Sequence, residues 1–274
     1  MLEKKAAQIR LLALESVYKA GVGNVGNLMS SVEILTALYY GEIFGRKIMK
    51  VDPTKPGWSG QDYLILSKVE AAPLQYAVLA DLGFFDKSEL AFLGRAGSIL
   101  KEYPSGKAPG VTGTILSKGY GLSFAVGLVL ALKMEKKGNK VFVLLSAEEL
   151  RQGQVWEAII AAAYHRLDNL IVFVDDPAVE VDVSQPVKIH VGQVQDKFKV
   201  FGWDVAQVID GHNFDQLLSG LDKSFKTVRK PSCIWCHTIA GKGIEFAERK
   251  TGYLNAILSE GEMLEILSKF NVSA

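Results

Sequence analysis

Cysteine and histidine are scarce in this sequence, and neither sign of charge is in clear excess. The chain of 274 residues has 2 cysteines and 4 histidines. Cys233 and Cys236 have the C-x-x-C spacing of redox and metal sites, but they lie in an apolar run typical of a strand. Alternation along a strand places such residues on opposite faces, so we interpret both as inert buried thiols. So few cysteines fit a reducing compartment, which favours a cytoplasmic protein.

Long apolar runs and long charged runs are also missing. No stretch is apolar enough to cross a bilayer, and the pattern over residues 3–20 is that of an amphipathic helix rather than a signal peptide. The net charge is only +1, from 31 basic and 30 acidic residues that are mixed along the chain. We therefore expect neither membrane insertion nor nucleic-acid binding.

The most informative stretch is a strand–helix–strand pattern in the middle of the chain. Val141–Leu145 and Leu170–Val174 are continuous aliphatic runs, and Gly153–Arg166 between them has a helical pattern. Runs of this kind predict strands of a parallel sheet that is covered on both faces. The loops expected after these strands, Ser146–Glu149 and Asp175–Ala178, would lie at the edge where an open α/β sheet binds its ligands.

Helical and strand-like patterns alternate through the rest of the chain. With 49% hydrophobic residues, they predict one α/β domain over residues 1–274, built as a doubly wound parallel sheet flanked by helices. Residues 94–120 and 45–61 read as loops. Ser30, Ser31 and Glu33 predict a capped helix start at Val32. The further helices are expected at 71–82, 87–93, 121–136, 213–224 and 261–270, and the further strands at 63–67, 203–208 and 232–237.

Several segments resemble the transketolase family, especially the separate N-terminal subunit of split transketolases. They include SSVEILTALYYGEIF, GLSFAVGLVLALK, GQVWEA, VIDGHNF and HTIAGKGIEF, and the resemblance runs from about residue 5 to about residue 250. It implies the thiamine-diphosphate-binding fold. In this family the cofactor lies between such a part and a pyrimidine-binding part. The resemblance therefore implies a separate transketolase C-terminal-like partner chain, a homo-oligomer, or both.

The side chains that bind the metal in this family are replaced here. The family's Gly-Asp-Gly is Ser146-Ala147-Glu148, and a later metal-binding Asn is Pro177. Mg²⁺ requires oxygen ligands, which neither Ala147 nor Pro177 offers from its side chain. We therefore expect no metal and no cofactor, and thiamine diphosphate with Mg²⁺ is the alternative that the resemblance implies.

The family's catalytic histidines are replaced as well. Their positions are occupied by Asn24, Glu70, Tyr103 and Leu254. No catalytic residue is assigned on this basis. The histidines that the chain has fall elsewhere, and we interpret His212, in the segment DGHNF, as structural.

The resemblance leaves a vestigial cofactor pocket formed by Ser117, Lys118, Gly119, Ser146, Glu148, Glu149, Gln152 and Asp175. We expect Lys118 to pair with Glu148 or Glu70, because a buried charge needs a partner. Without a metal, the carboxylates among these residues would repel a diphosphate.

Three functions follow from these observations. The first is a transketolase-like subunit that has lost metal binding, cofactor binding and ketol transfer, and that works by binding a partner. The second is an active thiamine-diphosphate-dependent subunit that works with a separate C-terminal chain. The third is an unrelated enzyme on the same scaffold, which would use a polar group formed by Glu70, Tyr103, Glu148 and Asp175.

Overall fold

The computed structural model describes residues 1–55, 57–180 and 194–272, and its centre is a five-stranded sheet. The strand order is β3-β4-β5-β7-β6, and every neighbouring pair is parallel. The strands come from the most apolar runs of the sequence, as a parallel sheet covered on both faces requires. Their bounds are β3 (Tyr63–Leu66), β4 (Val141–Ser146), β5 (Leu170–Ala178), β6 (Asp204–Val208) and β7 (Ser232–Ile239).

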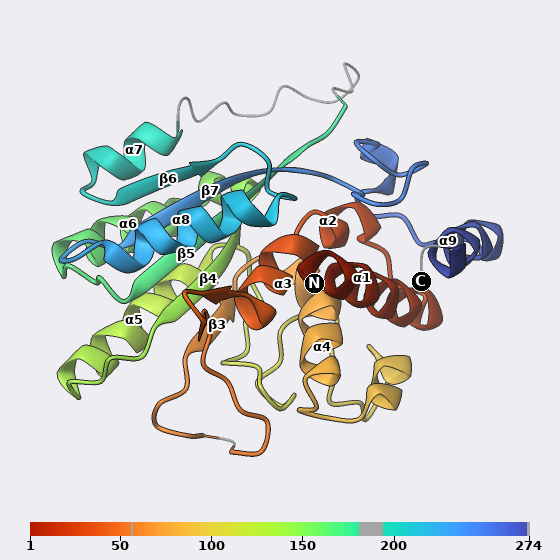
Figure 1. Ribbon diagram of the computed structural model, residues 1–274, viewed down its shortest axis with the longest axis horizontal. Helices are drawn as coiled ribbons and strands as arrows, with labels where there is room; N and C mark the ends of the chain where they lie inside the picture. The colour runs from red at the N-terminus through yellow and green to blue at the C-terminus, as the bar shows by residue number, and fades with distance from the viewer. Residues whose placement is uncertain (56, 181–193, 273–274) are drawn as a thin grey trace.

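Helices cover both faces of this sheet, as the sequence predicts (Figure 1). The apolar cluster on one face contains residues of α1 (Leu2–Ala20), α2 (Val25–Met29), α3 (Val32–Tyr40), α4 (Ala72–Asp81), α8 (Phe214–Lys226) and α9 (Glu260–Val272). The other face packs against α5 (Tyr120–Met134), α6 (Gly153–Tyr164) and α7 (Val194–Val200). The sheet therefore separates two apolar layers.

Alternation along the strands decides which layer each side chain enters. Phe142 and Leu144 of β4 face the layer of α1 and α8, whereas Val143 faces the layer of α5 and α6. Cys236 and Cys233 divide in the same way, so the two thiols lie on opposite faces, as predicted. Both are fully buried, and burial raises the pKa of each thiol, which keeps both unreactive.

The strand after α6 is longer than the sequence predicts. Residues 175–178, expected as a loop, are the last four residues of β5, and they pair with β7 as far as Ala178 beside Ile239. β4 ends at Ser146, beside Asp175. Pro177 therefore lies where β5 has a neighbour on one side only, so its missing N–H interrupts no second ladder. Because proline usually ends a strand, the sequence pattern placed the end of this strand at Val174, four residues too early.

Two further local predictions need correction. Residues 45–61 contain β2 (Arg46–Lys47), which pairs with β1 (Glu42–Ile43) across the turn formed by Phe44 and Gly45. Both turn residues have positive φ, 51° and 72°, and a phenylalanine is so uncommon there that the pattern did not indicate a hairpin. The helix at Val32 begins as predicted, but the side chains expected to cap it make tertiary contacts instead.

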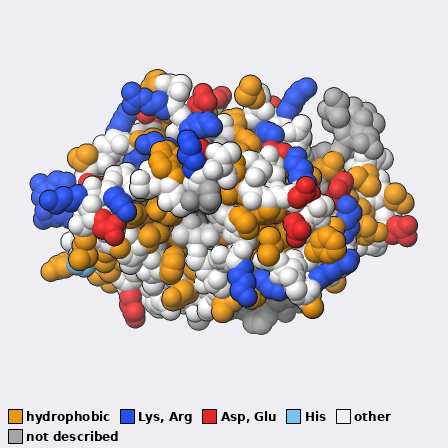
Figure 2. Space-filling model, turned by 90° about the horizontal axis from the view of Figure 1, so that it is seen from below, with side chains coloured by type: hydrophobic (Ala, Val, Ile, Leu, Met, Phe, Trp, Pro, Cys, Tyr) orange, Lys and Arg blue, Asp and Glu red, His pale blue; other side chains and the backbone are white. Residues whose placement is uncertain are grey.

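The remaining segments complete the chain. The connection before α5 contains only the short 3-10 helix η2 (Lys87–Phe92), and the other 3-10 helices are η1 (Val69–Ala71), η3 (Ala147–Arg151) and η4 (Thr251–Tyr253). On the face seen in Figure 2, basic and acidic side chains are interspersed with hydrophobic ones. Within the described ranges, we find no helix of the length and hydropathy needed to cross a membrane.

Candidate functional site

The polar residues singled out by the sequence gather at the carboxyl edge of the sheet. The segments after β3 and β4 supply Lys68, Glu70 and residues 146–151, and the end of β5 supplies Asp175. The loop before α5 adds Lys118 and Gly119. Parallel strands bring these segments together because their carboxyl ends meet at one edge.

The centre of this edge is a buried ion pair between β5 and the segment after β3. The Nζ atom of Lys68 lies 2.7 Å from Oδ2 of Asp175, and the two side chains are 1% and 0% exposed. The hydroxyls of Ser30 and Ser31 donate to the same oxygen at 2.8 and 2.6 Å. Thr238 of β7 donates to Oδ1. The carboxylate therefore joins four separate segments.

Lys68 is satisfied as completely as its partner. Its ammonium also donates to the carbonyl oxygen of Asn27 at 2.6 Å and to the hydroxyl of Ser30 at 2.8 Å. Burial by itself would raise the pKa of Asp175, but the Lys68 ammonium and the hydroxyl donors outweigh it and hold the pKa below its usual range. Asp175 was expected to line a cofactor pocket. It is instead an internal carboxylate that is already neutralised.

A second buried carboxylate, Glu149, fixes the loops on either side of β4. Its two oxygens accept from the N–H of Ser146 at 2.7 Å, from the hydroxyl of Ser67 at 2.5 Å and from the N–H of Gly119 at 2.7 Å. Burial raises the pKa of this carboxyl, while the three donors oppose the shift. Ser146 and Gly119 are thus brought together as predicted, but Glu149 points into the protein rather than into a cleft.

Gly119 closely approaches the start of α6. Its φ is 82°, and a Cβ added there would lie 3.0 Å from Cβ of Gln152, the N-cap residue of α6. Ser117, two residues earlier, is exposed and accepts from the N–H of Tyr120 through its carbonyl. The predicted residues therefore form two groups. Gly119, Glu149 and Asp175 are buried, whereas Ser117, Lys118, Glu148 and Gln152 form a partly or fully exposed rim.

The exposed rim is crossed by a bridge of opposite charges. Nζ of Lys118 lies 2.5 Å from Oε1 of Glu70 and 3.1 Å from Oε2 of Glu148. Burial lowers the pKa of Lys118, but the two carboxylates raise it further than burial lowers it. The predicted pairing is confirmed. The predicted burial is wrong, because the Lys118 side chain is 39% exposed, so solvent weakens the bridge.

The donors needed for a metal–diphosphate group do not converge at this edge. Ala147 and Pro177 supply no side-chain oxygen, and their acidic neighbours are engaged elsewhere. Glu148 pairs with Lys118, and Asp176 accepts from Nε1 of Trp235 at 3.0 Å. Across residues 1–55, 57–180 and 194–272, no three His, Cys, Asp or Glu side chains form a group that could hold a metal ion. Among the described residues, the side chains at the family's two metal-ligand positions and their acidic neighbours therefore do not fit thiamine diphosphate bound through Mg²⁺.

Of the four positions at which the resemblance places the family's histidines, Asn24 and Leu254 lie close together, whereas Glu70 and Tyr103 each make separate contacts. Asn24 precedes α2, and Leu254 follows η4, and their loops touch: a Cβ added to Gly26 would lie 3.1 Å from Cα of Leu254. Glu70 belongs to the Lys118 bridge. Tyr103 accepts through its carbonyl from the hydroxyl of Tyr76 at 2.6 Å. Asn and Leu have no group that exchanges a proton near neutral pH.

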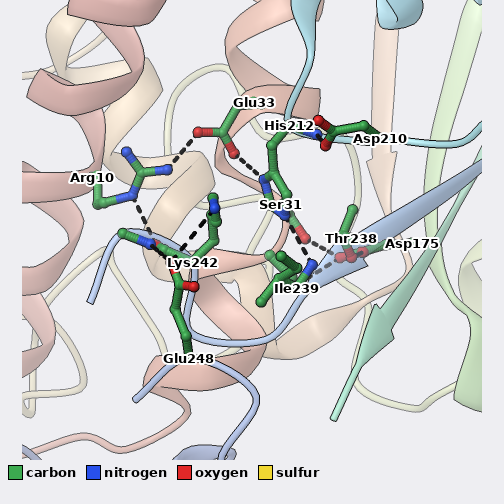
Figure 3. Close-up of polar contacts among 12 residues, drawn as sticks. Arg10, Ser31, Glu33, Asp175, Asp210, His212, Thr238, Ile239, Lys242 and Glu248 are labelled. Carbon is green, nitrogen blue, oxygen red and sulfur yellow. Dashed lines mark hydrogen bonds and ion pairs between the residues drawn. The ribbon is translucent and has the colours of Figure 1, made fainter. Parts of the chain in front are cut away.

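His212 belongs to a second network of hydrogen-bonded polar residues, shown in Figure 3. Its Nδ1 lies 2.7 Å from Oε2 of Glu33, and its Nε2 accepts from the N–H of Ile239 at 2.8 Å. The backbone donor therefore selects the tautomer protonated on Nδ1. Glu33 also pairs with the buried Arg10, which donates to the carbonyl of Lys242 at 3.1 Å. The interpretation of His212 as structural agrees with this geometry. His190 lies outside the described residues.

Sequence reasoning missed the partners of Asp175. Lys68, Ser30, Ser31 and Thr238 come from segments far apart in the chain, so no local spacing links them. One signal was present: a lysine directly after the apolar run that forms β3 is a cation next to the core, and such a cation requires a buried counter-charge.

Comparisons with known proteins agree with this fold. The family model "Transketolase, thiamine diphosphate binding domain" matches residues 2–273. The 6-deoxy-6-sulfo-D-fructose transketolase subunit SqwG of Clostridium sp. (strain MSTE9) is 38% identical over 94% of this chain and 92% of its own. One of the apulose-4-phosphate transketolase subunits of Phocaeicola vulgatus is 30% identical over 98% and 97%. The solved transketolase from Leishmania mexicana superposes with a TM-score of 0.85 at 26% identity, over 99% of this chain and 41% of that one.

Removing the buried ammonium tests its importance for stability. We expect Lys68→Met to lower the free energy of unfolding by about 3 kcal/mol or more, because it leaves Asp175 buried without a counter-charge. The matched control is Lys118→Met, which removes a half-exposed ammonium and should cost less than about 1 kcal/mol. Urea unfolding followed by circular dichroism measures both. Equal costs would contradict the role given to Lys68.

The pH dependence of stability tests the same pair independently. The pKa values of Asp175 and Glu33 are lowered in the folded chain, so their stabilising contribution is present above the unfolded pKa values of about 4 and is lost as the pH falls through the folded ones. We expect wild-type stability to fall below about pH 4.

In Lys68→Met, burial would instead raise the pKa of Asp175, so protonation in acid relieves the buried charge. The stability difference between wild type and this variant should therefore shrink as the pH falls, while that for Lys118→Met stays nearly constant. Parallel curves for all three proteins would show that the Lys68 ammonium does not lower the pKa of Asp175.

Proposed function

The chain belongs to the transketolase thiamine diphosphate-binding domain family, and we propose on this premise that it is one subunit of a two-chain transketolase-type assembly. Two relatives that match nearly its whole length are themselves named as transketolase subunits. The chain covers only 41% of the Leishmania enzyme, and a separate transketolase C-terminal-like chain would supply the remaining part. The family's oligomeric habit also suggests two copies of each chain.

We further propose that this subunit works by binding its partner rather than by holding the metal and diphosphate. The observation that carries this proposal is the set of side chains at the carboxyl edge. The resemblance places Ala147 and Pro177 at the family's metal-ligand positions, and Lys118 bridges Glu70 and Glu148. The chain thereby balances these charges itself. A diphosphate would have to displace this bridge and would find no metal ligand in its place.

The competing proposal is an active thiamine-diphosphate-dependent subunit with the same kind of partner. It is favoured by the 38% identity to a subunit named for transketolase activity. It requires that the partner chain, or a rearrangement of Glu148 or Asp176, supplies the missing oxygen ligands. The two proposals share the fold and the partner and differ only in cofactor binding.

Calorimetric titration of thiamine diphosphate separates the two proposals. We expect no magnesium-dependent heat when it is added to the chain alone or to the chain mixed with a candidate C-terminal subunit. Binding of the two chains, measured by light scattering after size exclusion, should be independent of the cofactor. Circular dichroism confirms in each case that the chain is folded.

A restored variant provides the matched control. Ala147→Asp combined with Pro177→Asn returns both metal ligands, and Lys118→Met removes the bridge. Magnesium-dependent binding by this triple variant, but not by wild type, would assign the loss to these positions. Micromolar magnesium-dependent binding by wild type would refute the partner-binding proposal and support the active subunit.

A further inference from the structure

A cavity of about 500 Å³ opens at the amino edge of the sheet, opposite the site described above. Asp62 and Lys140 lie directly before β3 and β4, and the hairpin of β1 and β2 and the end of α8 form the other walls. A volume of this size suits a small organic ligand. The lining residues are Ile43, Phe44, Arg46, Lys47, Ile48, Lys50, Asp62, Gly138, Lys140, Asp222, Phe225 and Lys226.

The charges around this cavity are unbalanced. Five of the lining residues are cations and two are acids. Asp62 accepts from the backbone N–H groups of Lys140 and Lys50 at 2.7 and 3.0 Å. Asp222 is occupied by Lys226 at 2.5 Å. Asp222 is therefore paired with Lys226, whereas Asp62 forms no direct ion pair among the described residues, although Lys50 and Lys140 attract its charge.

Four cations remain without an ion-pair partner in the part of the chain that the structure describes. They are Arg46, Lys47, Lys50 and Lys140. Glu42 faces Lys47 in the register of the hairpin but forms no ion pair with it among the described residues. The lining therefore carries more positive than negative charge even with Asp62 counted, and such an excess beside a cavity attracts an anion.

Lys140 is the most desolvated of these cations. Its Nζ lies 4.8 Å from the ring centroid of Phe225, and burial lowers its pKa. The Phe225 ring in turn packs edge-on against Phe142 in the core, with centroids 6.5 Å apart. Lys140 thus combines an ammonium that forms no direct ion pair among the described residues, although the carboxylates of Asp62 and Asp168 are near enough to attract it, with an adjacent rigid aromatic surface. Both features favour an anion attached to an apolar body.

Phe44 gives the cavity a second aromatic wall. This residue is 87% exposed and has a φ of 51°, a backbone conformation that non-glycine residues other than Asn and Asp seldom adopt. An Asn or Gly would suit the turn better. A large apolar side chain that is both exposed and conformationally unfavourable lacks a folding reason, and strain of this kind marks ligand sites.

We propose that this cavity binds a small phosphate ester of an aromatic or similarly flat compound. The phosphate lies beside Lys140 and the cations of the hairpin, and the flat body packs between Phe225 and Phe44. This site is at the opposite edge of the sheet from Ala147 and Pro177, and it needs no metal. Its existence is therefore independent of the proposed subunit function.

Calorimetric titration of phenyl phosphate into the full chain at low salt tests the proposal. Submillimolar binding is expected, with inorganic phosphate and phenol each at least about fivefold weaker, because each lacks half of the contacts. Added salt should weaken the binding through screening. Adenosine monophosphate, titrated in parallel, distinguishes a nucleotide from a simpler aryl phosphate.

Three variants make the result decisive. Lys140→Gln should weaken phenyl phosphate about fivefold, whereas Lys4→Gln, on the exposed side of α1, should leave it unchanged. Phe44→Asn should weaken binding about threefold while the melting temperature stays the same or rises, since Asn accepts positive φ. A merely structural Phe44 would not produce this opposite pair of effects.

Several outcomes would overturn the proposal. One is the absence of binding by phenyl phosphate up to millimolar concentration. Another is equal affinity for inorganic and phenyl phosphate, which would indicate diffuse charge attraction only. Equal effects of Lys140→Gln and Lys4→Gln would also refute it. None of these results bears on magnesium-dependent cofactor binding at the other edge.

Discussion

The structure depends on one buried pair of charges, Lys68 and Asp175. Two ions removed from water stabilise a protein only if their remaining hydrogen-bonding groups are also satisfied. Here the hydroxyls of Ser30, Ser31 and Thr238 complete the shell. These residues lie on the α2–α3 junction and on β7, while the ions lie on β5 and after β3. The pair therefore holds together the carboxyl edge of the sheet, where the family places its cofactor.

The rest of that edge is balanced by the chain itself. Glu149 is satisfied by backbone and hydroxyl donors. Lys118 pairs with both Glu70 and Glu148, and Arg151 lies 3.8 Å from Glu148 as a second cation. The expectation that these carboxylates would simply repel a diphosphate was therefore too strong. In a metal–diphosphate site, the ligand and the cation bring the balancing charges. Because the loops at this edge need neither a diphosphate nor a metal ion to balance their charges, they agree with the proposal that the subunit works by binding its partner.

The two edges of the sheet differ in how their charges are compensated. At the carboxyl edge, acids and bases are paired within hydrogen-bonding distance. At the amino edge, Asp222 is paired with Lys226, and Arg46, Lys47, Lys50 and Lys140 line the cavity without a direct ion pair among the described residues, so positive charge is in excess there. An excess of positive charge beside apolar walls, as at the amino edge, favours ligand binding more than the paired charges of the carboxyl edge do. The surface charge of the chain, nearly neutral in total, conceals this local difference.

The sequence alone determined the fold class, the central strands and the family, because these depend on local apolar runs and on the identity of single residues. It also determined that the two thiols lie on opposite faces, since alternation is a local property. That Ala147 and Pro177 replace the metal ligands stays a prediction from the resemblance. Only the tertiary structure decided that Asp175 is buried against Lys68, that β5 extends through Pro177, and that Phe44 turns a hairpin over a basic cavity. Each of these depends on segments distant in sequence, whose contacts override local propensity.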